Sequence, residues 1–384
     1  MKIAILTSNR FHIGADTKKG TEIVFRMLVE SLAKRTGNTE LSITAFCSGD
    51  SDLPVRIESI EKYPTSHDLT IPQEKNIIFE LALISKAFSM KDEFDIYHVH
   101  IGDGDIVLPF ARFISRPVII TIHHTFDKAY AKRYFTLFKD LKNVYFISLS
   151  NFQRKQLPFL PFAATIYNGI DTKQFAFDAS GGDSIMWSGR GIPAKGLDVA
   201  FAVVQKTKKI TNAFVIKKQE EVDWLEKTLQ LPTSLQIEQY LSVKFDSLRS
   251  DLIRYYQKSK LFLFPTALEE ACPLSALESM ACGTPVVAFA KGSLPELIVD
   301  GQTGFLINPT EDDIRGDWII KETGIAGLIE AVERIYSMPQ ADYLKMRENC
   351  REHVGKNFTV DKMTDGYVQA YQSILTLFNN NHRM

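Results

Sequence analysis

Short apolar runs alternate with segments of helical periodicity along most of the chain. In the first half, these runs predict strands at 2–8, 41–46, 95–101, 117–124, 143–150 and 163–169, with an amphipathic helix near 21–35. Continuous apolar, β-branched runs are typical of strands that are buried on both faces of a parallel sheet. Helical segments between such strands complete βαβ units, so the first half predicts a doubly wound α/β domain.

The alternation restarts after a polar segment with paired glycines at 173–184, which is typical of a linker. Strands are predicted at 184–189, 212–217, 234–239, 261–266, 285–290 and 304–307, with a helix from about Lys195 and helices near the C-terminus. Because 384 residues are too many for one ordinary core, we expect two doubly wound domains, 1–172 and 173–359. Such sheets bind ligands outside the carboxyl ends of their strands, so we expect the active site in a cleft between the domains.

Composition adds limits on partners and location. The chain carries 45 Lys and Arg against 46 Asp and Glu, and this balance does not indicate nucleic acid as a partner. Cys47, Cys272, Cys282 and Cys350 form no CxxC pair, which argues against a zinc site or a disulfide scaffold and fits a reducing compartment. The N-terminal apolar run is too short for a signal peptide, and no segment approaches the length of a membrane span. We therefore expect a cytoplasmic protein.

Candidate chemistry lies in the loop "SGRGIPAKG", which follows a predicted strand and precedes a helix. Its glycines let backbone amides approach an anion, and Arg190 and Lys195 could grip a diphosphate. Two solvated surface cations are the alternative interpretation. The chain has neither the GxxxxGK[ST] nor the GxGxxG motif, which argues against a nicotinamide-dependent oxidoreductase.

A second loop, "FPTALEEACPLSALESMACGTPVV", carries two glutamates eight positions apart. The preceding strand stops at Pro265, and a helix is predicted over about 274–281. Glu270 lies in the turn, and Glu278 lies one turn into the helix. Backbone amides at the helix start, around Cys272, Pro273 and Leu274, suit sugar hydroxyls or phosphate oxygens. A carboxylate accepts two hydrogen bonds and can hold vicinal hydroxyls, as on a ribose.

The segment from Pro265 to Ile307 resembles the signature of the retaining family 4 glycosyltransferases, whose hallmark is two glutamates with seven residues between them. "SGRGIPAKG" resembles the family's diphosphate grip, and "IYNGID" resembles the usual end of its first domain. "DIYHVH", "TIHH" and "FISLSNFQRKQL" resemble successive first-domain strands. This resemblance implies the α/β GT-B architecture, with two Rossmann-like domains facing across a cleft. A C-terminal helix, about 360–384, would cross back to pack on the first domain.

The resemblance also implies roles for single residues. Glu278 would bind the ribose hydroxyls of a nucleotide diphosphate sugar, and Glu270 would hold hydroxyls of the donor sugar. Arg190 and Lys195 would stabilise the departing diphosphate. The others are His123, beside the donor sugar at the bond-breaking centre; Gly20, close to donor phosphate or acceptor; and the backbone of Cys272, Pro273 and Leu274, on the donor sugar. No metal or other cofactor is implied.

These features predict a retaining hexosyltransferase that uses a nucleotide diphosphate sugar, with a UDP-hexose favoured and GDP-mannose next. The acceptor, whether glycan, lipid or small molecule, is not identified. One alternative is a hydrolysing nucleotide-sugar epimerase, which would lack the paired glutamates. Another is a catalytically silent nucleotide- or sugar-binding protein, against which the retained cations and glutamates argue.

Three other features have competing interpretations. "GDGD" at 102–105 resembles a metal-binding acidic pair, but Asp103 or Asp105 is more simply a helix cap. His98 and His100 alternate with apolar residues and are expected to line the core or the cleft. The basic, aromatic stretch 126–146 suggests peripheral contact with the inner membrane face. An ordinary crossover helix, with aromatics toward the sheet and solvated lysines, is the simpler alternative and the one we favour.

Overall fold

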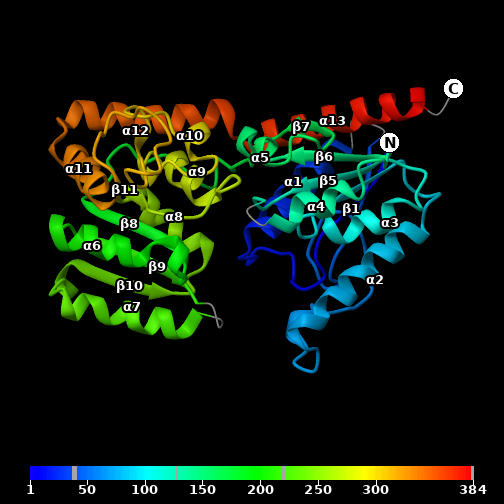
Figure 1. Ribbon diagram of the computed structural model, residues 1–384, viewed down its shortest axis with the longest axis horizontal. Coiled ribbons are helices and arrows are strands. Elements are labelled where there is room, and N and C mark those ends of the chain that lie inside the picture. Colours follow the sequence, from blue (N-terminus) through cyan, green and yellow to red (C-terminus); the bar gives the residue numbers. More distant parts are fainter. Residues whose placement is uncertain (37–40, 127–128, 218–220, 382–384) are drawn as a thin grey trace. The chain divides into compact units, whose positions relative to one another are not determined.

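The computed structural model describes residues 1–36, 41–126, 129–217 and 221–381. Contacts divide the chain into two compact units, Met1–Gly169 with Val360–Met384, and Ile170–Thr359 (Figure 1). Among the described residues, no helix is long and apolar enough to cross a bilayer.

The first unit contains, over its described residues, a seven-stranded parallel sheet in the order β3-β2-β1-β4-β5-β6-β7. Its strands are β1 (Lys2–Leu6), β2 (Ser42–Phe46), β3 (Arg56–Glu58), β4 (Ile96–Val99), β5 (Val118–Ile122), β6 (Val144–Ser148) and β7 (Phe162–Thr165). Its helices are α1 (Gly20–Thr36), α2 (Asn76–Ser89), α3 (Leu108–Ala111), α4 (Ala129–Thr136), α5 (Asn151–Gln156) and α13 (Val360–Asn381). All residues of β4 and β5 are buried, as their apolar runs predict.

The C-terminal helix α13 is part of the first unit although it follows the second in sequence. It packs against α1 and β7, and Arg35 of α1 forms an ion pair with Asp365 of α13. Tyr367 and Tyr371 on its inner face are fully buried. This helix therefore completes the core of the first unit.

The second unit contains a six-stranded parallel sheet over its described residues, in the order β10-β9-β8-β11-β12-β13. Its strands are β8 (Ser184–Arg190), β9 (Thr211–Ile216), β10 (Leu241–Phe245), β11 (Ser259–Phe264), β12 (Val286–Phe289) and β13 (Gly304–Ile307). Its helices are α6 (Leu197–Thr207), α7 (Val222–Ser234), α8 (Arg249–Gln257), α9 (Leu274–Ala281), α10 (Leu294–Leu297), α11 (Gly324–Ser337) and α12 (Gln340–Asn357). The prediction of two Rossmann-like α/β folds is confirmed.

The strand predicted at 234–239 is wrong. Helix α7 runs to Ser234, and a 3-10 turn occupies Glu238–Tyr240 before β10. Gln236 has a positive φ of 55°, which ends the helical conformation. The true strand begins seven residues further on, at Leu241, and lies at the sheet edge, where most of its residues are only partly buried. An edge strand of this kind lacks the continuous apolar run on which the prediction relied.

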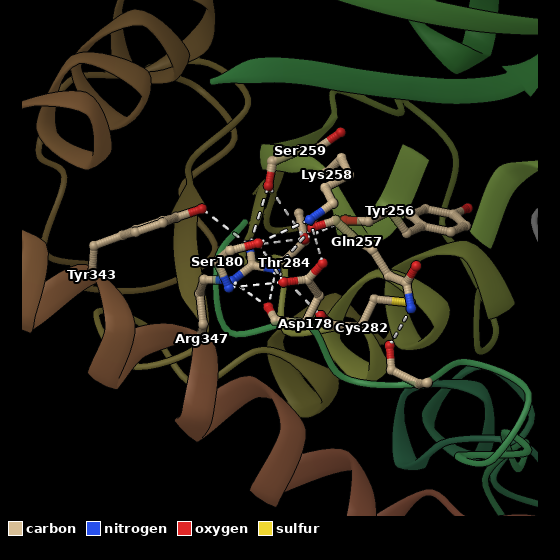
Figure 2. Close-up of polar contacts among 11 residues, drawn as sticks. Asp178, Ser180, Tyr256, Gln257, Lys258, Ser259, Cys282, Thr284, Tyr343 and Arg347 are labelled. Carbon is tan, nitrogen blue, oxygen red and sulfur yellow. Dashed lines mark hydrogen bonds and ion pairs between the residues drawn. The ribbon is translucent and has the colours of Figure 1, made fainter. Parts of the chain in front are cut away.

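A buried arginine fastens α12 to the rest of the second unit (Figure 2). The Arg347 guanidinium is fully buried and donates to the carbonyl oxygens of Asp178, Ser259, Gln257 and Cys282, and to the hydroxyls of Thr284 and Tyr343. Gln257 ends α8, Cys282 follows α9 and Ser259 begins β11, whereas Asp178 lies in the segment before β8. Arg347 therefore holds together α8, α9 and β11. Glu270 follows β11, and Glu278 lies on α9.

Each sheet reverses its winding direction at one point. In the first unit this point lies between β1 and β4, and in the second between β8 and β11. Loops that leave adjacent strands in opposite directions at such a point open a crevice, which is where doubly wound folds bind ligands. Lys195 follows β8, and Glu270 follows β11.

Candidate functional site

The loops after β8 and β11 are held together by backbone contacts. The amide of Ala267 donates to the carbonyl oxygen of Ala194 at 2.9 Å. Gly196 has a φ of +69°, and a Cβ there would lie 2.3 Å from the carbonyl oxygen of Pro265. Only glycine permits both this conformation and this approach. Gly196 therefore lets the loop after β8 bring Lys195 against the loop after β11.

Lys195 and Glu270 form a close ion pair. The distance from Nζ to Oε1 is 2.5 Å, and the two side chains are only 13% and 16% exposed. The Thr266 hydroxyl donates to the same carboxylate oxygen at 3.2 Å, and Ser293 donates its amide to the Glu270 carbonyl. The structure thus brings together two of the predicted residues, which lie 75 positions apart in sequence.

The neighbouring Glu269 belongs to a different network. Its carboxylate accepts from Arg315 at 2.8 Å and from the amide of Gly292 at 2.6 Å, and it lies 3.5 Å from Lys291. Arg315 and Lys291 also bind Asp313, and they hold the pKa of that carboxyl at about 2, with the Arg315 hydrogen bond as the main cause. Glu269 therefore ties loops together, whereas Glu270 faces the lysine after β8.

Glu278 lies on α9 and is paired with an arginine that the sequence analysis missed. Arg249 Nε lies 2.7 Å from Glu278 Oε1, and the side chains are 19% and 6% exposed. Burial, with Glu278 nearby, raises the pKa of Tyr256 well above its ordinary value. Arg249 Nη2 is buried and has no hydrogen-bond partner among the described residues. Arg249 is the first residue of α8, where the helix dipole disfavours a cation. This unusual position is the one signal that could have indicated a special role for Arg249.

The other predicted residues of the second unit are Arg190 and those at the start of α9. Arg190 ends β8, is exposed, and forms none of the ion pairs found within the described part of the chain. Helix α9 begins at Leu274 with Pro273 as its N-cap, as the sequence predicts. Pro273 has no N–H, so the expectation of an amide donor there is wrong. The amides available at this helix start are those from Leu274 onward.

In the first unit, His123 ends a row of three histidines, of which His98 and His100 are buried and His123 is partly exposed. Its Nε2 lies 2.8 Å from Nδ1 of His100, and Nε2 of His100 lies 3.4 Å from Nδ1 of His98. The Tyr371 hydroxyl on α13 and the Thr121 hydroxyl bind the two nitrogens of His98 at 2.7 and 2.8 Å. His98 and His100 are buried, as expected. Because Nε2 of His123 is engaged by His100, Nδ1 is its other ring nitrogen with hydrogen-bonding capacity.

Burial keeps these histidines neutral. It lowers the pKa of His98 to about 3, with a smaller contribution from His123. It lowers the pKa of His100 and His123 well below the ordinary value, and neighbouring charges, including Lys19 for His123, act in the same direction. A neutral imidazole donates one hydrogen bond and accepts another, so His123 can bind His100 with one nitrogen and a ligand with the other.

Helix α1 begins at Gly20, directly after Lys19, and Lys19 is near enough to His123 to act on its charge. Lys19 Nζ lies 3.4 Å from the buried Glu22 and 4.5 Å from the ring centre of Phe11. Burial raises the pKa of Glu22, although Lys19 opposes the shift. Gly20 is exposed, and a Cβ there would meet nothing within 4 Å among the described atoms. Its predicted contact with donor phosphate or acceptor stays a prediction.

The expectation that an aspartate of "GDGD" caps a helix is wrong. Gly104, with φ of 76°, holds the N-cap position of the 3-10 turn before α3. Asp105 accepts from the amide of Ile106, and Asp103 lies 3.3 Å from Nδ1 of His124. No group of three or more His, Cys, Asp or Glu side chains within the described residues is arranged to hold a metal ion.

Two family models match consecutive parts of the chain. The model described as "Glycosyltransferase Family 4" matches residues 18–174, and "Glycosyl transferases group 1" matches residues 171–353. The D-inositol 3-phosphate glycosyltransferase of Mycobacterium sp. (strain KMS) is 46% identical over 70 residues, which are 18% of this chain and 15% of that relative. The chain thus matches less than a fifth of that relative's length. An uncharacterized glycosyltransferase of Methanocaldococcus jannaschii is 24% identical over 295 residues, or 72% of this chain and 78% of the relative.

Solved structures show the same architecture over nearly the whole chain. Sucrose-phosphate synthase from Thermosynechococcus elongatus has a TM-score of 0.74 at 18% identity, covering 98% of this chain and 99% of that one. Anabaena HepE in complex with UDP has a TM-score of 0.72 at 16% identity, covering 97% and 100%. These likenesses identify the fold as that of the GT-B glycosyltransferases. With the two family matches, they show that the chain belongs to the glycosyltransferases of the family 4 type.

Proposed function

We propose that this protein is a retaining, metal-independent hexosyltransferase that takes its sugar from a nucleotide diphosphate donor. A UDP-hexose is the favoured donor, because HepE, a structural neighbour, is solved with UDP and with UDP-glucose, and GDP-mannose comes next. The observation that carries the proposal is the Lys195–Glu270 pair at the reversal point of the second sheet, with Glu278 following on α9.

In this reaction the bond from the sugar's anomeric carbon to the diphosphate oxygen breaks, and an acceptor hydroxyl bonds to the same face of that carbon. The products are a glycoside and a nucleoside diphosphate, and the acceptor hydroxyl loses its proton. Negative charge grows on the departing diphosphate. Lys195, which is largely withdrawn from water, and Arg190 would stabilise that charge without a metal ion.

The two carboxylates would bind different parts of the donor. Glu270, held by Lys195 and Thr266, presents acceptor oxygens for hydroxyls of the transferred sugar. Glu278 would hold the ribose hydroxyls, with Arg249 fixing its orientation. His123 would contact the donor sugar through Nδ1, because His100 occupies Nε2. These roles follow the family resemblance, and the local geometry supports them.

Two adjacent glutamates offer a matched test. Glu270→Gln keeps the shape but weakens the pairing with Lys195 and the hold on sugar hydroxyls. We expect release of UDP from UDP-glucose to fall on the order of 100-fold, while UDP itself binds nearly as tightly. Glu269→Gln removes the same charge one residue away, in the loop network, so its turnover should stay within about threefold of wild type. UDP release, with water as the acceptor, is measured by a coupled assay.

Several outcomes would contradict the proposal. Equal losses for the two variants would show that loop integrity, and not Glu270, supports turnover. Free sugar epimerised at C2 would indicate epimerase chemistry instead of transfer. Loss of wild-type turnover with EDTA, restored by a divalent ion, would overturn the metal-independent mechanism.

A further inference from the structure

Charge is distributed very unevenly along this chain. Residues 106–166 contain nine Lys and Arg, two Asp and no Glu, a net charge of +7 in a chain whose total is −1. Among the described residues of this stretch, the exposed cations are Arg112, Lys132, Arg133, Lys139, Lys142 and Lys155. None of these six forms an ion pair with another described residue. These charges are therefore open to solvent and available to an anionic partner.

Large apolar side chains are exposed among these cations. Phe113 is 81% exposed, Leu137 is 64% exposed and Tyr130 is 57% exposed. The other aromatic side chains of this segment face inward: Phe135 is buried, and Tyr134 and Phe138 pack against the core. Tyr130 of α4 and Leu137, directly after its end, are exposed instead. The simple crossover-helix interpretation of 126–146 therefore leaves them unexplained; Asp127 and Lys128 lie outside the described residues.

These side chains gather on one part of the first unit. The Asn143 amide donates to the carbonyl oxygens of Ala111 and Ile114 at 3.0 and 2.8 Å. This brings the segment after α4, with Lys139 and Lys142, against the end of α3. A small pocket lined by Phe138, Lys139, Leu141 and Phe159 continues the same surface. We call the exposed side chains of 112–113 and 130–142 the basic face.

We infer that the basic face docks this protein on an anionic lipid membrane. Cations near such a surface are attracted to its headgroups, and aromatic and aliphatic side chains enter the interface beneath them. A nucleic acid would attract the cations and could stack a base on Phe113, but it would leave Leu137 in water, which favours a membrane. The inference goes beyond the proposed function and does not depend on it, since it concerns neither donor nor catalytic residues.

Vesicle sedimentation tests the inference with the full chain and no nucleotide. Wild type should bind phosphatidylcholine vesicles containing about 30% phosphatidylglycerol in about 0.1 M salt, but not phosphatidylcholine alone, and about 0.5 M salt should weaken binding. Lys132→Glu with Arg133→Glu should weaken it at least about 25-fold, since each cation contributes about fivefold. Phe113→Ser with Leu137→Ser should weaken it at least about tenfold. The exposed Leu69→Ser, elsewhere on the same unit, should change nothing.

Two results would overturn the inference. One is no binding to the anionic vesicles at low salt. The other is full vesicle binding by the Phe113→Ser, Leu137→Ser variant together with tight heparin binding, which would indicate a polyanion surface. Since all substituted side chains are exposed, the variants should keep the wild-type unfolding midpoint, which separates docking from folding. Donor binding is measured separately, so failure of the proposed function would leave these results unchanged.

Discussion

The Arg249–Glu278 pair allows a quantitative test of the second-unit site. The perturbations are Arg249→Met, Glu278→Leu and the double variant. Removing one partner of a buried pair costs about 3–5 kcal/mol, because the remaining charge stays desolvated. Arg249 keeps about a fifth of its side-chain exposure and can reach water, which reduces the cost. We therefore expect Arg249→Met, which leaves the more buried Glu278 charge unpaired, to lower the free energy of unfolding by about 2–3 kcal/mol, and Glu278→Leu by about 1–2 kcal/mol.

The assay exploits the position of the tryptophans. All three, Trp187, Trp224 and Trp318, lie in the second unit, so their fluorescence reports its unfolding alone. In a urea titration, the double variant should lose about 1–2 kcal/mol less than the two single losses combined. Losses that add within about 0.5 kcal/mol would refute the pairing. The result also matters for the functional test. Glu278→Ala would remove the proposed ribose contacts and, at the same time, leave Arg249 without its ion-pair partner.

Two further predictions concern buried titratable and charged groups. The folded pKa of His98, about 3, lies below the ordinary value near 6.5, so its stabilising effect is present above about pH 6.5 and lost as pH falls toward 3. The first unit should lose up to about 1.4 kcal/mol per pH unit for this group, measured by circular dichroism, and His98→Asn should flatten the slope. A slope unchanged by that variant would contradict the assignment. Arg347→Met should destabilise the second unit by about 3–5 kcal/mol in tryptophan-detected urea unfolding, and a loss below about 1 kcal/mol would be inconsistent with its buried contacts.

Much of the fold could be predicted because parallel strands buried on both faces have unbroken apolar runs. β11 and β12 are fully buried; β12 lies within its predicted segment, β11 begins two residues before its own, and α9 begins and ends at the predicted residues. Such runs are absent where a strand is short or at an edge. β3 (Arg56–Glu58) was not predicted, and β10 was placed too early, because packing on one side leaves half of their residues exposed or polar.

The site was predictable only where local spacing carries the information. Glu270 and Glu278 are separated by a fixed strand–turn–helix unit, so their spacing is visible in sequence. The partner of Glu278, Arg249, comes from another element 29 positions away, and no local pattern connects them. The same holds for Tyr371, which binds His98 from a helix 273 positions later. Contacts of this kind are set by the folding of the whole unit.

Binding of a nucleoside diphosphate is the central claim, and thermal unfolding with UDP, GDP or ADP tests it most directly. A ligand at about a hundred times its dissociation constant adds about 2.7 kcal/mol of stability. For a unit of this size, that is an upward shift of about 5–10 °C in the midpoint of tryptophan fluorescence. The account predicts this shift with UDP, or failing that with GDP. No shift with any of the three at millimolar concentration would contradict it.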